Sequence, residues 1–368
     1  MFVRALLTLA LALCGLSCQR SSQPGLVYPD NPDLHYVGWF DRSVPTAPRA
    51  AWAGSQITAR FTGTSIRAYL SDRPVDDRLR ERDRITVLID DQPAKTFALA
   101  EGRHTYWLAR GLGSGTHEVT IWKRTEPEVG VIMFHGLRLD PDAALTPSPS
   151  AARRMVFIGD SITAGYGNEG DSPACHWSAA SENNYETYGA RAARELSADY
   201  LAMAWSGKGV TRNFYAEDKP TLPELWDLVI PTEAGSPRVP RTKVDVVVVN
   251  LGTNDVFRGL PDADTFVSMY AALLSALRGH FGKDALIVLA LGPMLADDSP
   301  QPQARSTMRE WLAAARALRA QAGDTKLEFI EFWFDPKEGA GCDWHPNLKT
   351  HARLGQELAE LLRARMKW

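Results

Sequence analysis

The amino-acid sequence predicts an α/β protein: a three-layer α/β/α domain with a parallel sheet, preceded by an all-β domain of the jelly-roll sandwich type. A chain of 368 residues exceeds the usual size of one domain. Residues 28–142 contain short segments in which apolar and polar side chains alternate, whereas residues 154–368 contain near-continuous apolar runs separated by helical patterns. Between them lies a stretch rich in Pro, Ser and Ala, residues 143–153, which we interpret as the domain linker.

The chain opens with the composition of a secretory leader, residues 1–18. An early arginine is followed by an apolar run over residues 5–13, which is shorter than the about 20 residues that a membrane-spanning helix needs. The tetrapeptide Gly-Leu-Ser-Cys at residues 15–18 also resembles the cleavage box of bacterial lipoproteins. Cys18 would then carry a lipid anchor, and the alternative is its removal with an ordinary leader. We therefore expect a secreted, periplasmic or cell-surface monomer.

Within residues 28–142, successive segments place apolar side chains on one face, as strands of an antiparallel sheet do. About eight strands fit this length, which favours a sandwich over a barrel. The clearest segments are residues 57–61, 66–70, 85–89, 119–121 and 131–134.

Strands that are apolar on both faces and alternate with helices indicate a parallel sheet covered on both sides. In the second domain the apolar runs are residues 155–158, 200–205, 244–249, 286–291 and 327–332. The helical patterns between and after them span roughly residues 183–197, 262–279, 303–321 and 348–365.

Composition excludes several classes of function. The net charge of −3, with both signs interspersed, leaves no basic stripe for a nucleic acid. The His, Asp and Glu residues show no metal-ligand spacing, and no phosphate-binding glycine loop is present, so we expect neither a metal nor a cofactor. Outside the leader, Cys175 and Cys342 are candidates for one disulfide in an oxidising compartment, and two separate buried thiols are the alternative.

The first apolar run of the second domain ends in Gly-Asp-Ser-Ile, which presents the hydroxyl of Ser161 at the carboxyl edge of the sheet. By itself this pattern also fits a helix cap. A serine nucleophile needs a base, which His345 can supply, and a group such as Asp343 to hold the imidazole in one tautomer. The N–H groups of Ser161 and Gly207, with the side-chain amide of Asn254, would stabilise an oxyanion.

Four motifs, each at a strand end, resemble in order the blocks of the SGNH hydrolases, also called the GDSL family. They are Gly159-Asp160-Ser161-Ile162, Gly207, Gly252-x-Asn254-Asp255, and Asp343 with His345. The added β domain, Cys175, and the string Cys-Asp-Trp-His-Pro-Asn at residues 342–347 are similar to carbohydrate esterase family 2. The resemblance implies a flavodoxin-like SGNH-hydrolase domain. It also implies a serine esterase that removes O-acetyl groups from plant cell-wall polysaccharides of the xylan or glucomannan type, often at sugar 6-O positions.

One departure concerns the acid that orients the base. The wider family spaces these residues as Asp-x-x-His, whereas Asp343 stands only two places before His345. The backbone carbonyl of Trp344 is an alternative orienting group, and Asp335 is a third.

Several further residues have competing interpretations. His176 and His351 are rival bases, although the first fits a surface loop and the second a packed helix. Trp177 and Trp344 could stack on sugar rings, although most tryptophans lie in cores. The family pattern gives Asp160 and Asp255 supporting roles in the loops that carry Ser161 and Asn254.

Two other functions compete with polysaccharide deacetylation. One is hydrolysis of another acyl substrate, such as an O-acetylated bacterial glycan or a small ester. The other is carbohydrate binding without catalysis. The absence of a Gly-x-Ser-x-Gly elbow argues against an α/β-hydrolase lipase.

Overall fold

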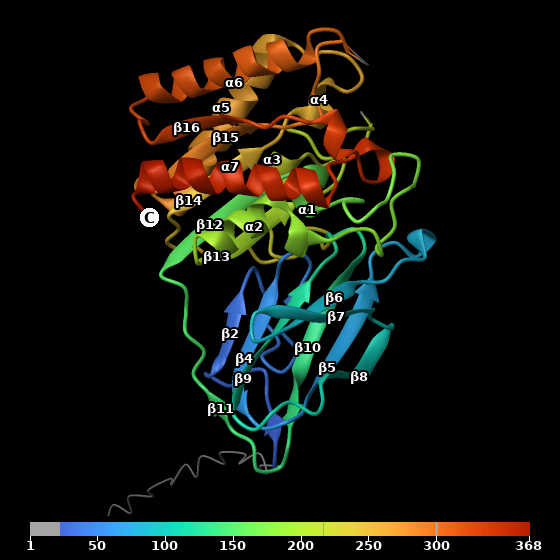
Figure 1. The fold of residues 1–368 in the computed structure, drawn as a ribbon. Coiled ribbons are helices and arrows are strands. Elements are labelled where there is room, and N and C mark those ends of the chain that lie inside the picture. Colours follow the sequence, from blue (N-terminus) through green and yellow to red (C-terminus); the bar gives the residue numbers. More distant parts are fainter. Residues whose placement is uncertain (1–22, 216, 299–300) are drawn as a thin grey trace, which may run out of the picture.

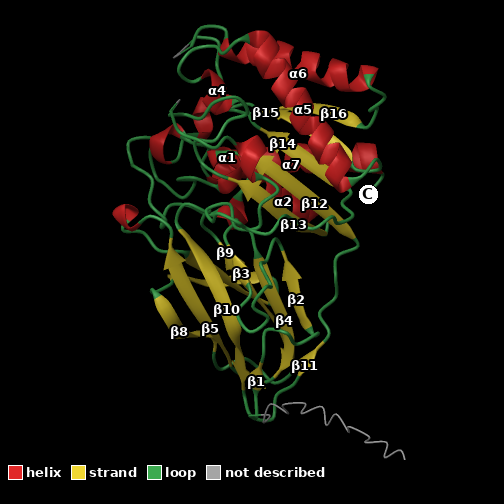
Figure 2. Cartoon of the chain, turned by 180° about the vertical axis from the view of Figure 1, so that it is seen from behind, coloured by secondary structure: helices red, strands yellow, loops and turns green. Residues whose placement is uncertain are grey.

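The computed structural model describes residues 23–368, apart from residue 216 and residues 299–300. The expected leader and Cys18 lie outside the described residues. Figures 1 and 2 show a β sandwich at one end of the molecule and a layered α/β domain at the other. Among the helices that are described, none combines the length and apolar character needed to cross a membrane.

The first domain consists of two antiparallel sheets whose inner faces enclose one apolar core. One sheet contains β1 (Leu26–Val27), β3 (Arg49–Ala50), β5 (Ile66–Pro74), β8 (Gly102–Ala109) and β10 (Gly130–Leu139). The other contains β2 (Leu34–Val37), β4 (Gln56–Thr62), β6 (Arg84–Ile89), β7 (Gln92–Ala98), β9 (Thr116–Lys123) and β11 (Leu145–Thr146). The predicted sandwich is confirmed, with more strands than the expected eight because three of them have only two residues.

The expected linker is shorter than predicted. Strand β11 falls inside residues 143–153 and pairs with β4, with Leu145 opposite Phe61. Leu145 also packs against the core of the sandwich, so an apolar side chain outweighs the surrounding Pro and Ser residues. The irregular connection is therefore confined to residues 147–152.

The second domain contains a five-stranded parallel sheet in the order β13-β12-β14-β15-β16. Counted within the domain this is the order 2-1-3-4-5, the flavodoxin-like topology that the resemblance implied. The strand order reverses between β12 and β14, and ligands bind beyond the carboxyl ends of strands at such a point. The strands are β12 (Arg153–Gly159), β13 (Ala198–Ala204), β14 (Val246–Asn250), β15 (Leu286–Leu291) and β16 (Leu327–Glu331).

Helices cover both faces of this sheet (Figure 1). On one face α2 (Tyr188–Glu195) and α7 (Leu348–Met366) bury their apolar sides, and on the other α5 (Ala263–Phe281) and α6 (Ala304–Gln321) do so. These four helices confirm the predicted helical segments. The one-turn helices α1 (Ser161–Ala164), α3 (Leu222–Leu225) and α4 (Thr253–Val256) are too short to show a period. The described 3-10 turns are η1 (Asp77–Leu79), η2 (Asn184–Glu186), η3 (Pro336–Glu338) and η4 (Cys342–Trp344).

The two domains share an apolar interface. Trp52 of the sandwich is fully buried in the core of the α/β domain, and its indole N–H donates to the carbonyl of Leu228 at 2.8 Å. Trp122 stacks on Tyr200 of β13, with ring centroids 5.6 Å apart. Aromatic side chains of this size contribute much of the apolar area in any interface. The sandwich is therefore packed against the α/β domain as part of one structure.

Candidate active site

Ser161 lies at the carboxyl end of β12, where the strand turns into α1. Asp160 is the N-cap of this helix, and its carboxylate accepts the N–H of Ile162 at 3.0 Å. At Gly159 any side chain would collide with Thr163, so the turn can pass this close only with glycine. The cap interpretation thus applies to Asp160, and the hydroxyl of Ser161 remains available for another partner.

That partner is His345. Its Nε2 lies 2.8 Å from the Oγ of Ser161, although the two residues are 184 positions apart in the chain. The other ring nitrogen, Nδ1, lies 3.2 Å from the backbone carbonyl oxygen of Asp343. Because a carbonyl can only accept, the proton sits on Nδ1, and Nε2 is free to accept the serine proton. This is the geometry of a serine activated by a neutral imidazole.

The prediction that the Asp343 carboxylate orients His345 is corrected by this geometry. The carboxylate instead accepts the hydroxyl of Tyr166 and the backbone N–H of Trp177, both at 3.0 Å, and pairs with Nδ1 of His176 at 2.9 Å. Burial tends to raise the pKa of Asp343, but hydrogen bonds from His176, Trp177 and Tyr166 outweigh it and leave this pKa below its ordinary value. The carboxylate therefore stays charged and organises the loop around the histidine.

The backbone conformation explains why the carbonyl takes the orienting role. Asp343 has φ 50° and ψ 38°, and Trp344 has φ 64°, so two consecutive residues adopt the left-handed region that side chains disfavour. This turn brings the carbonyl of Asp343, and not that of Trp344, to the imidazole. Asp335, the third alternative, caps η3 through the N–H of Lys337.

Burial lowers the pKa of His345 to about 4, and hydrogen bonds to the backbone carbonyls of Asp343 and Cys342 oppose this shift only in part. We expect kcat/KM for a small acetyl ester to stay level from neutral pH down to about 5, because only neutral His345 can accept the serine proton. The rate should fall to half near the pKa of about 4. An unperturbed histidine would instead give a midpoint at about 6.5, and a midpoint there in the measured profile would contradict this prediction.

A folding control must accompany that profile. Burial also lowers the pKa of His351, to about 3, so both histidines bind protons more weakly in the folded chain than in the unfolded one. Stability is then lost as the pH falls from about 6.5 through these folded values. Circular dichroism at each pH separates this loss of fold from protonation of the base.

The residues expected as oxyanion donors lie at the next two strand ends. Gly207, after β13, adopts φ 75°, which suits glycine, and Asn254 lies in α4 after β14. The amide of Asn254 donates to the carbonyl of Lys208 at 2.9 Å and meets Asp160 only at 3.5 Å. One of its two N–H groups thus anchors the Gly207 loop, and the weakly engaged one can turn to an oxyanion.

Asp255 fixes the conformation of the same loop. Its carboxylate accepts the backbone N–H groups of Val210, Thr211 and Arg212 and the hydroxyl of Thr211. Asp255 therefore supports the loop after β13, next to Gly207, whereas its expected role was in the loop that carries Asn254. Because this loop is fixed, the N–H of Gly207 would need no reorganisation when charge develops on a substrate oxygen.

Comparison with known proteins identifies the family. The model of the GDSL-like lipase/acylhydrolase family matches residues 157–353, more than half of the chain. The chain belongs to this family. Residues 36–149 match the carbohydrate esterase 2 N-terminal model, which covers most of the sandwich. The two matches together place the chain among the family 2 carbohydrate esterases.

Individual relatives agree with this assignment. The chain is 33% identical to the cellulase/esterase CelE of Acetivibrio thermocellus over 92% of its own length, and it spans only 40% of that relative. An acetylxylan esterase/glucomannan deacetylase of Cellvibrio japonicus is 26% identical over 86% of the chain and 82% of the relative. A family 2 carbohydrate esterase from Clostridium thermocellum, solved with cellohexaose, superposes with a TM-score of 0.84 at 31% identity, covering 91% of this chain and 99% of that one.

Tyr166 is a residue of this esterase that the sequence analysis missed. Its ring lies against the imidazole of His345, with centroids 4.2 Å apart, and its hydroxyl donates to the Asp343 carboxylate. It therefore shields the base from water and holds the loop that carries it. A signal was present, since Tyr166 stands between two glycines immediately after α1, and both adopt positive φ.

The two predicted sugar-binding tryptophans are placed differently. Trp344 is 67% exposed directly beside His345, as a stacking surface would be. Trp177 is half-buried, stacks on Tyr166 with centroids 5.8 Å apart, and donates its indole N–H to Glu182 at 2.9 Å. One ring face and the indole N–H of Trp177 thus have protein partners that support Tyr166, and its sugar contact stays a prediction.

The other candidate residues are also accounted for. Cys175 and Cys342 are joined in a disulfide, and Asp343 donates its backbone N–H to the carbonyl of Cys175 at 2.9 Å, so the bridge ties the histidine loop to the loop after α1. His176 is exposed and bound to Asp343, and His351 is buried and accepts the N–H of Tyr188. Neither competes with His345 as the base.

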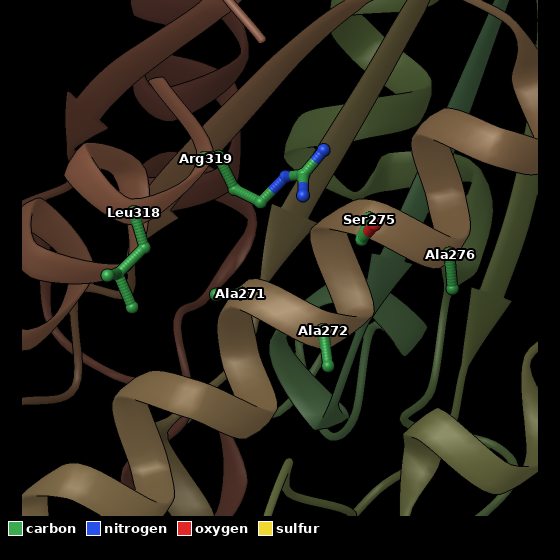
Figure 3. Close-up of a pocket in the computed structure, with 6 residues that line it drawn as sticks. All are labelled: Ala271, Ala272, Ser275, Ala276, Leu318 and Arg319. Carbon is green, nitrogen blue, oxygen red and sulfur yellow. The ribbon is translucent and has the colours of Figure 1, made fainter. Parts of the chain in front are cut away.

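Within the part of the chain that is described, no three His, Cys, Asp or Glu residues gather as metal ligands would. A shallow hollow elsewhere on the surface lies between α5 and α6 (Figure 3). Its lining consists of small or aliphatic side chains with Ser275 and Arg319, and none of the proposed reacting residues reaches it. The candidate active site therefore lies at the carboxyl edge of the sheet.

The orientation of His345 leads to a prediction for Asp343→Asn. We expect this variant to lose only about tenfold in kcat/KM, because the backbone carbonyl that holds the imidazole remains. Where a carboxylate itself orients the histidine, the same change costs about 10⁴-fold. Steady-state kinetics on a small acetyl ester distinguishes the two results, and a loss of the larger size would restore the carboxylate to the orienting role.

Proposed function

We propose that this chain removes O-acetyl groups from carbohydrate by way of an acyl-enzyme formed on Ser161. The observation that carries the proposal is the 2.8 Å contact between Ser161 Oγ and His345 Nε2, with Nδ1 of the same ring held by a backbone carbonyl. The sequence predicted these two residues as nucleophile and base, and the family assignment supports ester hydrolysis as their reaction.

In the first half-reaction His345 takes the proton of Ser161 as the Oγ attacks the acetyl carbonyl carbon. The negative oxygen of the tetrahedral intermediate accepts hydrogen bonds from the N–H groups of Ser161 and Gly207 and from the amide of Asn254. The bond from carbon to the sugar oxygen then breaks, and His345 returns its proton to that oxygen. Water, activated by the same imidazole, releases acetate and restores the free hydroxyl of Ser161.

We further propose that the substrate is an acetylated plant polysaccharide of the xylan or glucomannan type, with the sugar 6-O position as one target. The names of the Cellvibrio japonicus relatives support this choice, as does the cellohexaose bound to the Clostridium thermocellum esterase. The exposed indole of Trp344 beside the base offers an apolar face on which a sugar ring can stack.

Replacing Trp344 by alanine tests the substrate proposal. We expect KM for acetylated glucomannan to rise about tenfold, because a stacked aromatic contributes on the order of 1 kcal/mol or more. The kinetics of a small acetyl ester should stay within about twofold, since that substrate does not reach the indole. Acetate release, followed position by position on acetylated xylan and glucomannan, supplies the measurement.

The same assay separates the rival functions. Turnover of a small ester or a bacterial O-acetyl glycan with no release from plant polysaccharide would favour another acyl substrate. Retention on a polysaccharide column without any acetate release would favour a binding protein.

We also propose that the chain is exported and is a monomer. Its mature N-terminus would either be Cys18 carrying a lipid or begin after Cys18 has been removed with the leader. The composition of the leader supports export, and so does the disulfide between Cys175 and Cys342, since such bridges persist in oxidising compartments. Mass spectrometry of the mature N-terminus tests both export and lipidation, and light scattering tests the oligomeric state.

A further inference from the structure

The loop between β9 and β10, residues 124–129, belongs to the sandwich but reaches the catalytic edge of the α/β domain. The Oε2 of Glu126 accepts the backbone N–H of Ser206 at 2.5 Å. Ser206 immediately precedes Gly207, whose N–H is one of the proposed oxyanion donors. Glu126 is only 2% exposed, so its carboxyl group is removed from water and committed to protein partners.

Glu126 is connected in the other direction to the histidine loop. Its backbone N–H donates to Oε1 of Glu182 at 2.7 Å, and Oε2 of Glu182 accepts the indole N–H of Trp177 at 2.9 Å. The backbone N–H of Trp177 then donates to the carboxylate of Asp343, whose carbonyl holds His345. A continuous series of hydrogen bonds thus runs from the oxyanion loop through the sandwich to the catalytic base.

The loop that carries Glu126 is itself held rigidly. The buried ammonium group of Lys123 donates to Asp83 and to the carbonyl of Thr125, both at 2.6 Å. The buried guanidinium of Arg124 donates to the carbonyl of Glu182 from two nitrogens, at 2.9 and 3.1 Å. Buried hydrogen-bond networks of this kind restrict the positions of their members.

We propose that Glu126 is a positioning residue for the oxyanion donors, supplied to the α/β domain by the sandwich. The inference rests on the proposed esterase mechanism. Glu126 fixes the peptide of Ser206 and thereby the N–H of Gly207, and through Glu182 it sets this donor relative to His345. Misplacing a catalytic group by about 1 Å can cost on the order of a hundredfold in rate. We therefore expect the loss of Glu126 to lower kcat and to leave KM nearly unchanged.

Four variants, assayed with a small acetyl ester, test the proposal. Glu126→Ala removes the acceptor, and we expect kcat to fall about 10- to 100-fold with KM within about twofold. Glu126→Asp keeps the carboxyl group but withdraws it by one methylene, and it should lose nearly as much. Glu126→Gln keeps both the length and an acceptor oxygen, and kcat should stay within about threefold of the parent. Burial raises the pKa of Glu126 to about 7, which makes the neutral amide a close substitute.

Glu233→Gln is the matched control, because Glu233 also crosses the domain interface. It pairs with Arg49 at 2.8 Å and with Arg73, yet none of its described contacts reaches the oxyanion loop. We expect this variant to keep the parent kcat even where thermal unfolding shows a lower Tm.

Three results would overturn the proposal: an unchanged kcat in Glu126→Ala, equal losses in Glu126→Gln and Glu126→Asp, or an equal loss in Glu233→Gln. If Glu126→Ala does not fold, the order of the Gln and Asp variants decides. Failure of the esterase proposal is distinguishable, because the parent enzyme itself would then release no acetate or would do so without Ser161.

Discussion

Replacing Ser161 by alanine should reduce acetyl-ester hydrolysis by about 10⁴-fold or more, because the atom that forms the acyl-enzyme is lost while the oxyanion donors remain. Ser161 is 8% exposed. Its hydroxyl does not cap α1, because Asp160 has that role. The fold should therefore be unchanged. The measurement is acetate release under single-turnover conditions, with circular dichroism to confirm the fold.

Ser275→Ala is the control for this experiment, since it makes the same chemical change on the exposed face of α5, beside the hollow in Figure 3. It should behave as the parent enzyme. Turnover of Ser161→Ala within about a hundredfold of the parent would exclude Ser161 as the nucleophile.

The second large effect is expected for Asn254→Ala, with kcat reduced about 10²- to 10³-fold, since one of the oxyanion donors is removed. KM should change little, because the donor binds the transition state more strongly than the neutral carbonyl of the substrate. The comparison of kcat with KM on a small ester is the measurement.

Asn254→Asp sharpens this prediction because it keeps the size of the side chain and removes both N–H groups. It should be at least as slow as the alanine variant, since a carboxylate would repel the oxyanion. If Asn254→Asp kept most of the parent kcat, Asn254 would have no part in stabilising the oxyanion.

Much of the fold could be predicted from local sequence because burial leaves a local trace. Strands such as β14 are apolar on both faces and read as buried runs, and the long helices carry an apolar stripe. Ser161 and His345 could be found because the fold places the ends of parallel strands at one edge. The two-residue strand β11 could not be found, since its pairing with β4 depends on the packing of a single leucine.

The error at Asp343 has a physical origin: sequence spacing does not specify backbone conformation or distant contacts. Asp343 stands two places before His345, which suggested a carboxylate at the imidazole, but left-handed conformations at Asp343 and Trp344 bring the carbonyl of Asp343 there instead. The contacts of Trp177 with Tyr166 and Glu182 could not be predicted either, because tertiary packing sets them. Residues that act from another domain leave no pattern near the motifs they support.

The buried tryptophans at the domain interface define what can be separated in this protein. Cutting the chain within residues 147–152 would leave Trp52 and Trp122 uncovered on one fragment and the matching apolar surface on the other. The connection therefore does not mark the border of an interchangeable module. Chimeras and fusions with other enzymes should carry the sandwich and the α/β domain together, as a single unit.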